Sequence, residues 1–260
     1  MRPLTAKSHL LAALAITAAA VAAAFAIPAS PAQATTITIN GDGGGFVAGS
    51  GHEVAAARRV GAFTALRVEG SVDVTAHPGA AGVVVHADDN IEPLIETVVE
   101  GDTLVVRLRR NASFRTSDKV SVDVAFASLS ETQQHGSGDL HVTGVSGPRL
   151  ASSIHGSGDL EIDGAQVGSF SLAIAGSGDA RLSGHADEAR FKVDGSGDVH
   201  AAHFPARRVE VDVAGSGDAE VNATEAIDAR VAGSGDVVYE GHPHDVSRRV
   251  AGSGSIEARH

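Results

Sequence analysis

Cysteine is absent from the 260 residues, and aromatic side chains make up only 3 % of them. Without cysteine the chain can form no disulfide, no thiolate metal site and no thiol nucleophile, and no lipid can be attached to an N-terminal cysteine. The core must therefore be built from Ala, Val, Leu and Ile, which suits thin repeated layers better than one thick globular centre. Because 43 % of the chain is apolar, its 31 glycines do not indicate disorder, and a folded core is expected.

Basic residues are also scarce, with 20 Lys and Arg against 32 Asp and Glu, so the formal net charge is −12. Nucleic acids and anionic membrane surfaces both require clustered Lys and Arg to replace their counterions. We therefore expect no nucleic acid partner and no binding to anionic membranes, and we interpret the negative charge mainly as a contribution to solubility.

The first 34 residues have the pattern of a cleavable signal peptide. Arg2 and Lys7 form a positive start, residues 10–27 form an uncharged apolar run, and Ala32-Gln33-Ala34 gives a small-x-small cleavage site. A single transmembrane anchor is the alternative, because a run of about 18 residues is near the lower limit for crossing a bilayer. No later segment is long or apolar enough to span a membrane, so we expect none after signal cleavage. The destination is periplasmic, cell-surface or secreted.

A short turn motif recurs along the second half of the chain. Gly-Ser-Gly-Asp begins at Gly136, Gly156, Gly176, Gly195, Gly215 and Gly233, and a seventh copy, Gly252-Ser253-Gly254-Ser255, lacks the acid. Steps of 18 to 20 residues separate the copies. Repetition this regular indicates a solenoid, in which each repeat packs against its neighbours.

Apolar residues alternate with polar ones on both sides of each turn, as in Leu160-Glu161-Ile162. A period of two is typical of β-strands, so each repeat supplies one strand entering the turn and another leaving it. We predict an all-β, single-domain parallel β-helix, or β-solenoid, with coils of about 19 residues. A left-handed hexapeptide helix is the rival geometry, and the lack of a six-residue sub-repeat argues against it. A second, variable turn closes each coil, for example at residues 183–187 and 240–244.

Upstream segments alternate in the same manner, at residues 63–74, 82–87, 91–100 and 103–109. We predict that residues 59–128 form irregular N-terminal coils that cap the solenoid and that residues 129–260 form its regular repeats. Residues 35–58, which include a glycine-rich stretch at 41–45, are expected to be a flexible tether.

The turn motif has a sufficient structural explanation. Glycine permits positive φ and close backbone approach, while Ser and Asp satisfy turn amides. If the acids stack one per coil, however, carboxylates about 5 Å apart repel each other, and outward splaying, amide hydrogen bonds, raised pKa values or bound cations would relieve the repulsion. Calcium is the one cofactor considered, and the weak candidate ligands are Asp139, Asp159, Asp179, Asp198, Asp218 and Asp236.

No catalytic signature is found, and neither catalytic nor cofactor-binding residues are assigned. The sequence has no Gly-x-Ser-x-Gly elbow, no Walker loop and no His-Glu-x-x-His pair. His242-Pro243-His244 is the tightest histidine group, but it lacks a third ligand at zinc-like spacing, so these histidines are interpreted as exposed turn residues.

The sequence resembles the head GIN domain family of bacterial exported proteins, a domain of unknown function named for auto-transporter adhesins. The resemblance covers residues 59–260 and rests on the Gly-Ser-Gly-Asp series and on the segments at residues 63–70, 99–106 and 237–243. It implies a right-handed parallel β-helix with an adhesin-like role, and it supplies no catalytic or ligand residues. We expect a non-enzymatic protein that presents stacked surfaces to a glycan or an envelope or surface protein. The alternative, by analogy of fold alone, is a polysaccharide lyase or hydrolase.

Overall fold

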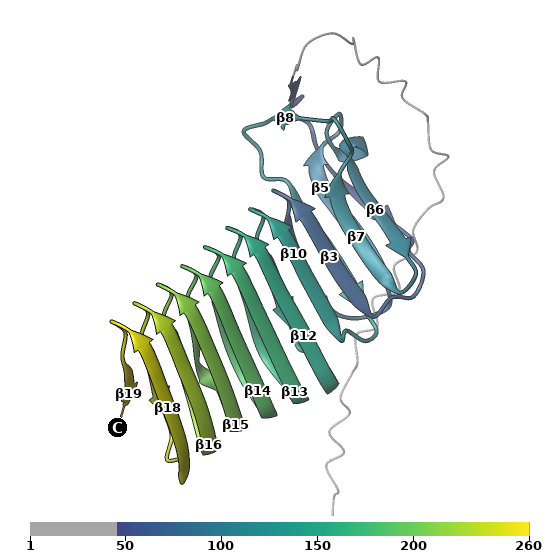
Figure 1. Ribbon diagram of the computed structural model, residues 1–260. Helices are drawn as coiled ribbons and strands as arrows, with labels where there is room; N and C mark the ends of the chain where they lie inside the picture. Colours follow the sequence, from purple (N-terminus) through teal and green to yellow (C-terminus); the bar gives the residue numbers. More distant parts are fainter. Residues whose placement is uncertain (1–45, 260) are drawn as a thin grey trace, which may run out of the picture. The chain divides into compact units, whose positions relative to one another are not determined.

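The computed structural model describes residues 46–259, and its main body is a stack of parallel strands (Figure 1). The strands that run into the turns pair in parallel and in register along the stack, so that Gly136 faces Gly156 and Gly156 faces Gly176. These strands are β10 (Glu131–Gly136), β12 (Ser146–Gly156), β13 (Leu160–Gly176), β14 (Ala180–Gly195), β15 (Val199–Gly215), β16 (Ala219–Gly233) and β18 (Asp245–Gly252). The predicted β-solenoid is thereby confirmed.

The strands that leave the turns form a second parallel row. It begins with β11 (Leu140–Thr143), continues through the first residues of β13 to β16, and ends with β17 (Val237–Glu240) and β19 (Ile256–Ala258). In the middle coils the chain remains a strand through the second bend, and the register between β14 and β15 shifts between Arg181 and Ala186. The variable second turn predicted at residues 183–187 therefore lies inside β14, while the one at residues 240–244 separates β17 from β18.

The core of the solenoid consists of the inward-facing residues of each coil. Ile154, Ile174 and Val193 stack on one side of it and are at most 1 % exposed. Near the second bend Phe170 fills the wider part of the interior, with its ring centroid 5.1 Å from that of Phe204. Burial of such side chains stabilises each coil by roughly 1.5–3 kcal/mol per large residue.

The N-terminal region shares one coil with the solenoid and then departs from it. Strands β3 (Ala65–Gly70) and β4 (Asp73–Pro78) pair in parallel with β10 and β11. Antiparallel pairs follow, formed by β5 (Gly82–Asp88) with β9 (Ser121–Phe126) and by β6 (Ile95–Glu100) with β7 (Thr103–Leu108). The irregular coils expected over residues 59–128 are thus largely replaced by a mixed sheet. Tight turns such as Glu100-Gly101-Asp102 return the chain beside itself, which favours antiparallel pairing.

The segment predicted as a tether is ordered over its second half, and that part of the prediction is wrong. Strand β2 (Glu53–Arg58) pairs antiparallel with β5, and β1 (Val47–Ala48) pairs with β8 (Phe114–Arg115). Arg58 anchors β2 because its guanidinium donates to the carbonyl oxygen of Ile95 at 2.6 Å and forms an ion pair with Glu92 in the short 3₁₀ helix η1 (Glu92–Leu94). The signal peptide predicted at residues 1–34 and the tether over residues 35–45 lie outside the described residues.

The two ends of the stack differ. At the C-terminal end no further coil of the described residues lies beside β18 and β19, so the inward-facing Val246 and Val250 are 39 % and 46 % exposed. Within residues 46–259, no helix reaches the length and apolar character needed to cross a membrane.

Candidate binding surfaces on the solenoid

The turn glycines form a glycine ladder in which each coil touches the one before it. A Cβ added at Gly156 would lie 2.2 Å from the carbonyl oxygen of Gly136, and one at Gly158 would lie 2.2 Å from that of Gly138. The first glycine of each turn also has positive φ, +134° at Gly156. Both glycines are therefore required by the close stacking of the turns.

The six aspartates form an aspartate ladder, defined by Asp139, Asp159, Asp179, Asp198, Asp218 and Asp236. Each carboxylate accepts a hydrogen bond from the backbone amide of the residue at the same turn position in the next coil. The Asp198 amide, for example, donates to Oδ1 of Asp179 at 2.9 Å, and the Asp218 amide donates to Oδ1 of Asp198 at 2.8 Å. Of the arrangements considered for relieving the repulsion between stacked acids, the structure shows amide hydrogen bonds.

The C-terminal end of the aspartate ladder has a physical explanation. The last copy of the motif carries Ser255 in place of the acid, and its amide still donates to Oδ1 of Asp236 at 2.7 Å. Among residues 46–259 no further coil offers an amide at this position, so an acid in place of Ser255 would accept no such bond from them. The end of the aspartate series is therefore consistent with the end of the stack.

An eighth turn, which the sequence analysis missed, precedes the regular series. Residues 70–73 read Gly-Ser-Val-Asp, and the Asp139 amide donates to Oδ1 of Asp73 at 3.2 Å across 66 residues of chain. The third position tolerates Val72 because its Cβ need not avoid a preceding turn. The sequence does carry a signal for this turn, because residues 70–73 match three of the four motif positions. The turn was missed because it lies 66 residues before the next copy, far outside the 18–20-residue period.

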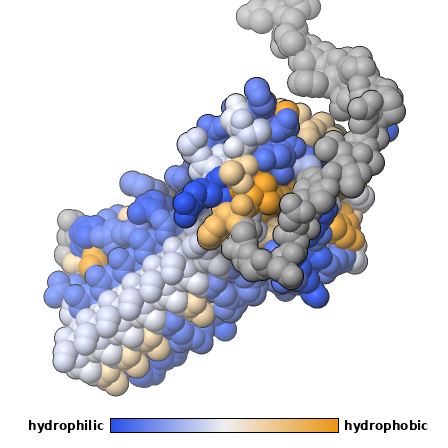
Figure 2. Space-filling model, turned by 90° about the horizontal axis from the view of Figure 1, so that it is seen from above, coloured by the Kyte–Doolittle hydropathy of each residue, from blue (hydrophilic) through white to orange (hydrophobic). Residues whose placement is uncertain are grey.

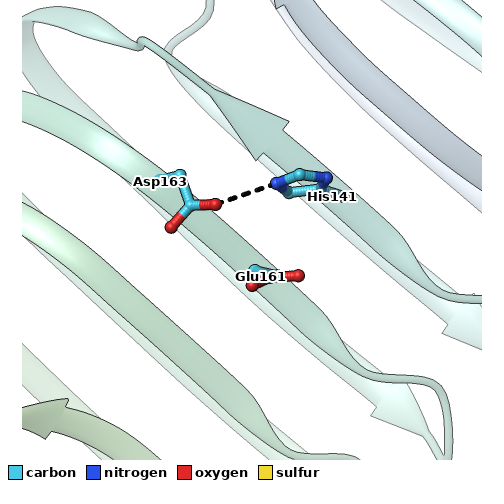
Figure 3. A group of neighbouring side chains, drawn as sticks. All are labelled: His141, Glu161 and Asp163. Carbon is cyan, nitrogen blue, oxygen red and sulfur yellow. Dashed lines mark hydrogen bonds and ion pairs between the residues drawn. The ribbon is translucent and has the colours of Figure 1, made fainter.

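The outward surface of the second row of strands gathers acids and histidines beside the aspartate ladder. His141 on β11 and Asp163 on β13 point toward each other, with Nε2 and Oδ2 3.0 Å apart, and Glu161 lies beside them on β13 (Figure 3). One ligand atom from each of the three lies within 4.8 Å of the other two, as is also true of Asp179, Asp198 and His200. Only the second group contains ladder residues.

Hydrogen bonding explains the electrostatics of the first group without an ion. The His141 ring and the Ser183 hydroxyl both hydrogen-bond to Asp163 and lower the pKa of that carboxyl. His135 and His155 lie before the first two turns with their rings stacked at 4.8 Å. Burial, and then the neighbouring His155, lowers the pKa of His135.

The first three residues of each turn, Gly-Ser-Gly, present an uncharged surface beside the aspartate ladder. Viewed from above, Figure 2 shows a pale band along the stack, with blue hydrophilic residues on one side and a row of tan residues along the other. The band corresponds to the repeated Gly and Ser of the turns, which offer few side-chain atoms for contact with a partner. Recognition of a partner is better served by the charged rows.

An open groove of about 730 Å³ crosses the coils on another side of the solenoid, near the second bend. Its rim alternates in charge: Arg208 Nη1 lies 3.1 Å from Glu188 Oε1, and Arg190 Nη2 lies 2.5 Å from Glu210 Oε2. The groove is lined by residues at corresponding positions of β12 to β16 and β18, namely Arg149, Ala151, Ser169, Phe170, Ser171, Glu188, Ala189, Arg190, Arg208, Val209, Glu210, Ala226, Ile227, Asp228, Asp245 and Ser247. The repeat thus generates a periodic polar surface that sequence reasoning did not identify, because it depends on the position of the second bend.

Solved structures share this architecture. A "putative adhesin" from Bacteroides fragilis NCTC 9343 superposes with a TM-score of 0.76 at 24 % identity, over 82 % of this chain and 100 % of that one. Another "putative adhesin", from Parabacteroides distasonis ATCC 8503, gives a TM-score of 0.68 at 22 % identity, covering 83 % and 100 % of the two chains. A "putative lipid binding protein" from the same strain gives 0.69 at 26 % identity, again covering 83 % and 100 %.

Comparison with curated protein sequences yields no match. A family model described as "Putative auto-transporter adhesin, head GIN domain" matches residues 62–243, which include the coil of β3 and β4 and nearly all of the repeats. The chain belongs to this head GIN domain family.

Proposed function

We propose that this protein is an exported, non-enzymatic adhesin-like protein that presents the stacked surface of its solenoid to a glycan or to an envelope or surface protein. The family and two of its structural neighbours carry adhesin names, which supports an adhesin-like role and an exported or surface location. The observation that carries the proposal is the groove, which crosses successive coils and has Arg and Glu side chains of neighbouring coils on its rim.

The periodicity of the groove favours a polymer over a compact small molecule. Successive coils place side chains at corresponding positions of the groove, most of them polar or charged, at a spacing of about 4.8 Å. The guanidinium groups of Arg190 and Arg208 and the carboxylates of Glu188 and Glu210 can donate to and accept from hydroxyl and carboxylate groups of a chain lying across the coils. A glycan is therefore the preferred partner within this proposal.

The test is binding of the purified protein to an immobilised panel of cell-envelope and extracellular polysaccharides. The double variant Arg190→Ala/Arg208→Ala should bind at least tenfold more weakly, a loss of about 1.4 kcal/mol or more. Arg181→Ala is the control for loss of positive charge outside the groove, because Arg181 lies on the outward surface beside the aspartate ladder, 3.7 Å from Asp159. Equal binding by all three proteins would refute the groove as the binding surface.

The same incubations test the alternative of a polysaccharide lyase or hydrolase. Mass spectrometry of the polymers after incubation detects newly cleaved or unsaturated ends. Intact polymers are expected. New ends that increase with protein concentration would overturn the non-enzymatic proposal.

A further inference from the structure

Three loops of the N-terminal region meet at one end of the mixed sheet. The first loop follows β1 and contains Gly49. The second follows β5, whose last residue is Asp88, and the third follows β8 and contains Thr116 and Asp118. None of these residues belongs to the glycine ladder, the aspartate ladder or the groove. The meeting point is a separate feature of the fold.

Asp88 is the innermost group of this feature and is fully buried, with 0 % exposure. Its Oδ2 accepts a hydrogen bond from Thr116 Oγ1 at 2.7 Å. Its Oδ1 is buried without a hydrogen-bond partner among the described residues. A buried carboxylate is stable only when its charge is balanced and both of its oxygens accept hydrogen bonds or bind a cation. Oδ1 of Asp88 has neither among the described residues.

The surrounding side chains add negative charge. The half-buried Asp118 lies within hydrogen-bonding reach of Asp88, whose proximity raises the pKa of Asp118, and Glu53 adds to that shift. Glu53 is paired with Asp88 across strands β2 and β5. Among the ion pairs within residues 46–259, none involves Asp88, Asp118 or Glu53, and the adjacent Lys119 is directed to Asp73 at 4.0 Å.

The loops around these acids are fixed in place. Asn90 Nδ2 donates to the Ala48 carbonyl oxygen at 2.7 Å, and its Oδ1 accepts from the Ser50 amide at 3.1 Å. The chain at Gly49 passes so close to Asp88 that an added Cβ would lie 2.1 Å from its Oδ2. The backbone on this side of Asp88 is therefore held against its carboxylate.

We propose that the carboxylates of Asp88 and Asp118 bind one calcium ion. Hard divalent cations prefer several oxygen ligands, and calcium accepts the irregular arrangement that loops provide. The unpartnered Oδ1 of Asp88 is the atom that needs a cation. Asp118 is only partly buried, so an ion can reach the two carboxylates from solvent on its side. The aspartate ladder makes no such demand, because its Oδ1 atoms already accept amide hydrogen bonds.

The test is calorimetric titration of the full protein with CaCl₂ at pH 7.5 after treatment with a chelator, together with thermal unfolding. One calcium ion per chain is expected, with Kd in the range of about 10⁻⁴ to 10⁻³ M that is typical of extracellular modules. At 10 mM calcium the melting temperature should rise by about 3–10 °C. Potassium chloride of equal ionic strength is the control for screening.

Two variants should lose the calcium response, Asp88→Asn and Asp118→Asn. The matched controls Asp198→Asn, in the aspartate ladder, and Glu257→Gln, an exposed acid of the last strand, should retain it. Because asparagine removes charge and little volume, Asp118→Asn should melt in chelator at or above the wild-type temperature, which separates lost binding from misfolding.

Calcium binding that survives in Asp118→Asn but disappears in Asp198→Asn would move the site to the aspartate ladder and overturn the proposal. Absence of calcium binding by the wild type, together with a melting temperature that rises between pH 7.5 and 5.5, would overturn it in favour of a proton shared by the two carboxyl groups.

Discussion

The glycine ladder makes a quantitative prediction for Gly197→Ala. The added Cβ would lie 2.1 Å from the carbonyl oxygen of Gly178, whereas real Cβ contacts do not fall below 3.0 Å, so the coils must separate locally by about 0.9 Å. The hydrogen bonds on either side, from Ser196 to Gly176 and from Asp198 to Asp179 Oδ1, are both 2.9 Å long. Lengthened to about 3.8 Å, neither remains a hydrogen bond.

The cost follows from these losses. Two hydrogen bonds contribute about 1 kcal/mol each, and overpacking of the interface adds about 1 kcal/mol or more. We therefore expect Gly197→Ala to lower the free energy of unfolding by about 3 kcal/mol, measured by denaturant unfolding followed by circular dichroism. Gly61→Ala is the control, because a Cβ there has open space, and it should stay within about 0.5 kcal/mol of the wild type. A loss below about 1 kcal/mol for Gly197→Ala would refute the steric argument.

Three further predictions concern acceptors and protons. Asp198→Ala leaves the Asp218 amide without its acceptor and should cost about 1–3 kcal/mol in denaturant unfolding, whereas Asp198→Asn keeps an oxygen there and should cost less than half as much; equal losses would contradict the acceptor role. Because the pKa of Asp163 is lowered in the folded protein, its charged form stabilises the protein above the ordinary pKa, and this stability is lost as pH falls through the lowered pKa. The difference in free energy of unfolding between wild type and Asp163→Asn should therefore become smaller below about pH 4. Denaturant unfolding at a series of acid pH values measures this difference, and a constant difference would contradict the prediction. The pKa of His135 is also lowered in the folded protein, so the unfolded protein takes up this proton at a higher pH and the free energy of unfolding should fall as pH drops below about 6.5. His135→Ala should make the free energy of unfolding less dependent on pH in this range, and an unchanged dependence would exclude His135 as its source.

The regular half of the fold was predictable because its information is local and repeated. Each Gly-Ser-Gly-Asp copy places a tight turn, and the alternation around residues such as Ile154 and Leu160 fixes which side faces inward. A constant period then sets the register between coils. Nothing beyond twenty residues of context is needed for any of these inferences.

The N-terminal region could not be predicted in the same way, because its pairings join segments of different sequence. Strand β2 becomes ordered only through contacts with β5 and through Arg58, whose partner Glu92 is 34 residues away. The buried position of Asp88 likewise depends on three loops meeting, and an isolated Asp-Asp-Asn sequence does not reveal it. The groove was missed because neighbours across coils lie about 20 residues apart and the second bend has no constant motif.

The different ends of the ladders make coil number an adjustable property. A middle coil needs its two glycines to pack against the coil before it and its aspartate to bond the coil after it, so every middle coil is equivalent to its neighbours. Val72 and Ser255 replace motif residues in the first and last turns of the series. Duplication of one repeat would therefore be accepted without alteration at either terminus and would extend the body by about 4.8 Å. Gene duplication within such a sequence would therefore change the length of the stack in steps of one coil while leaving the mixed sheet at its N-terminal end unchanged.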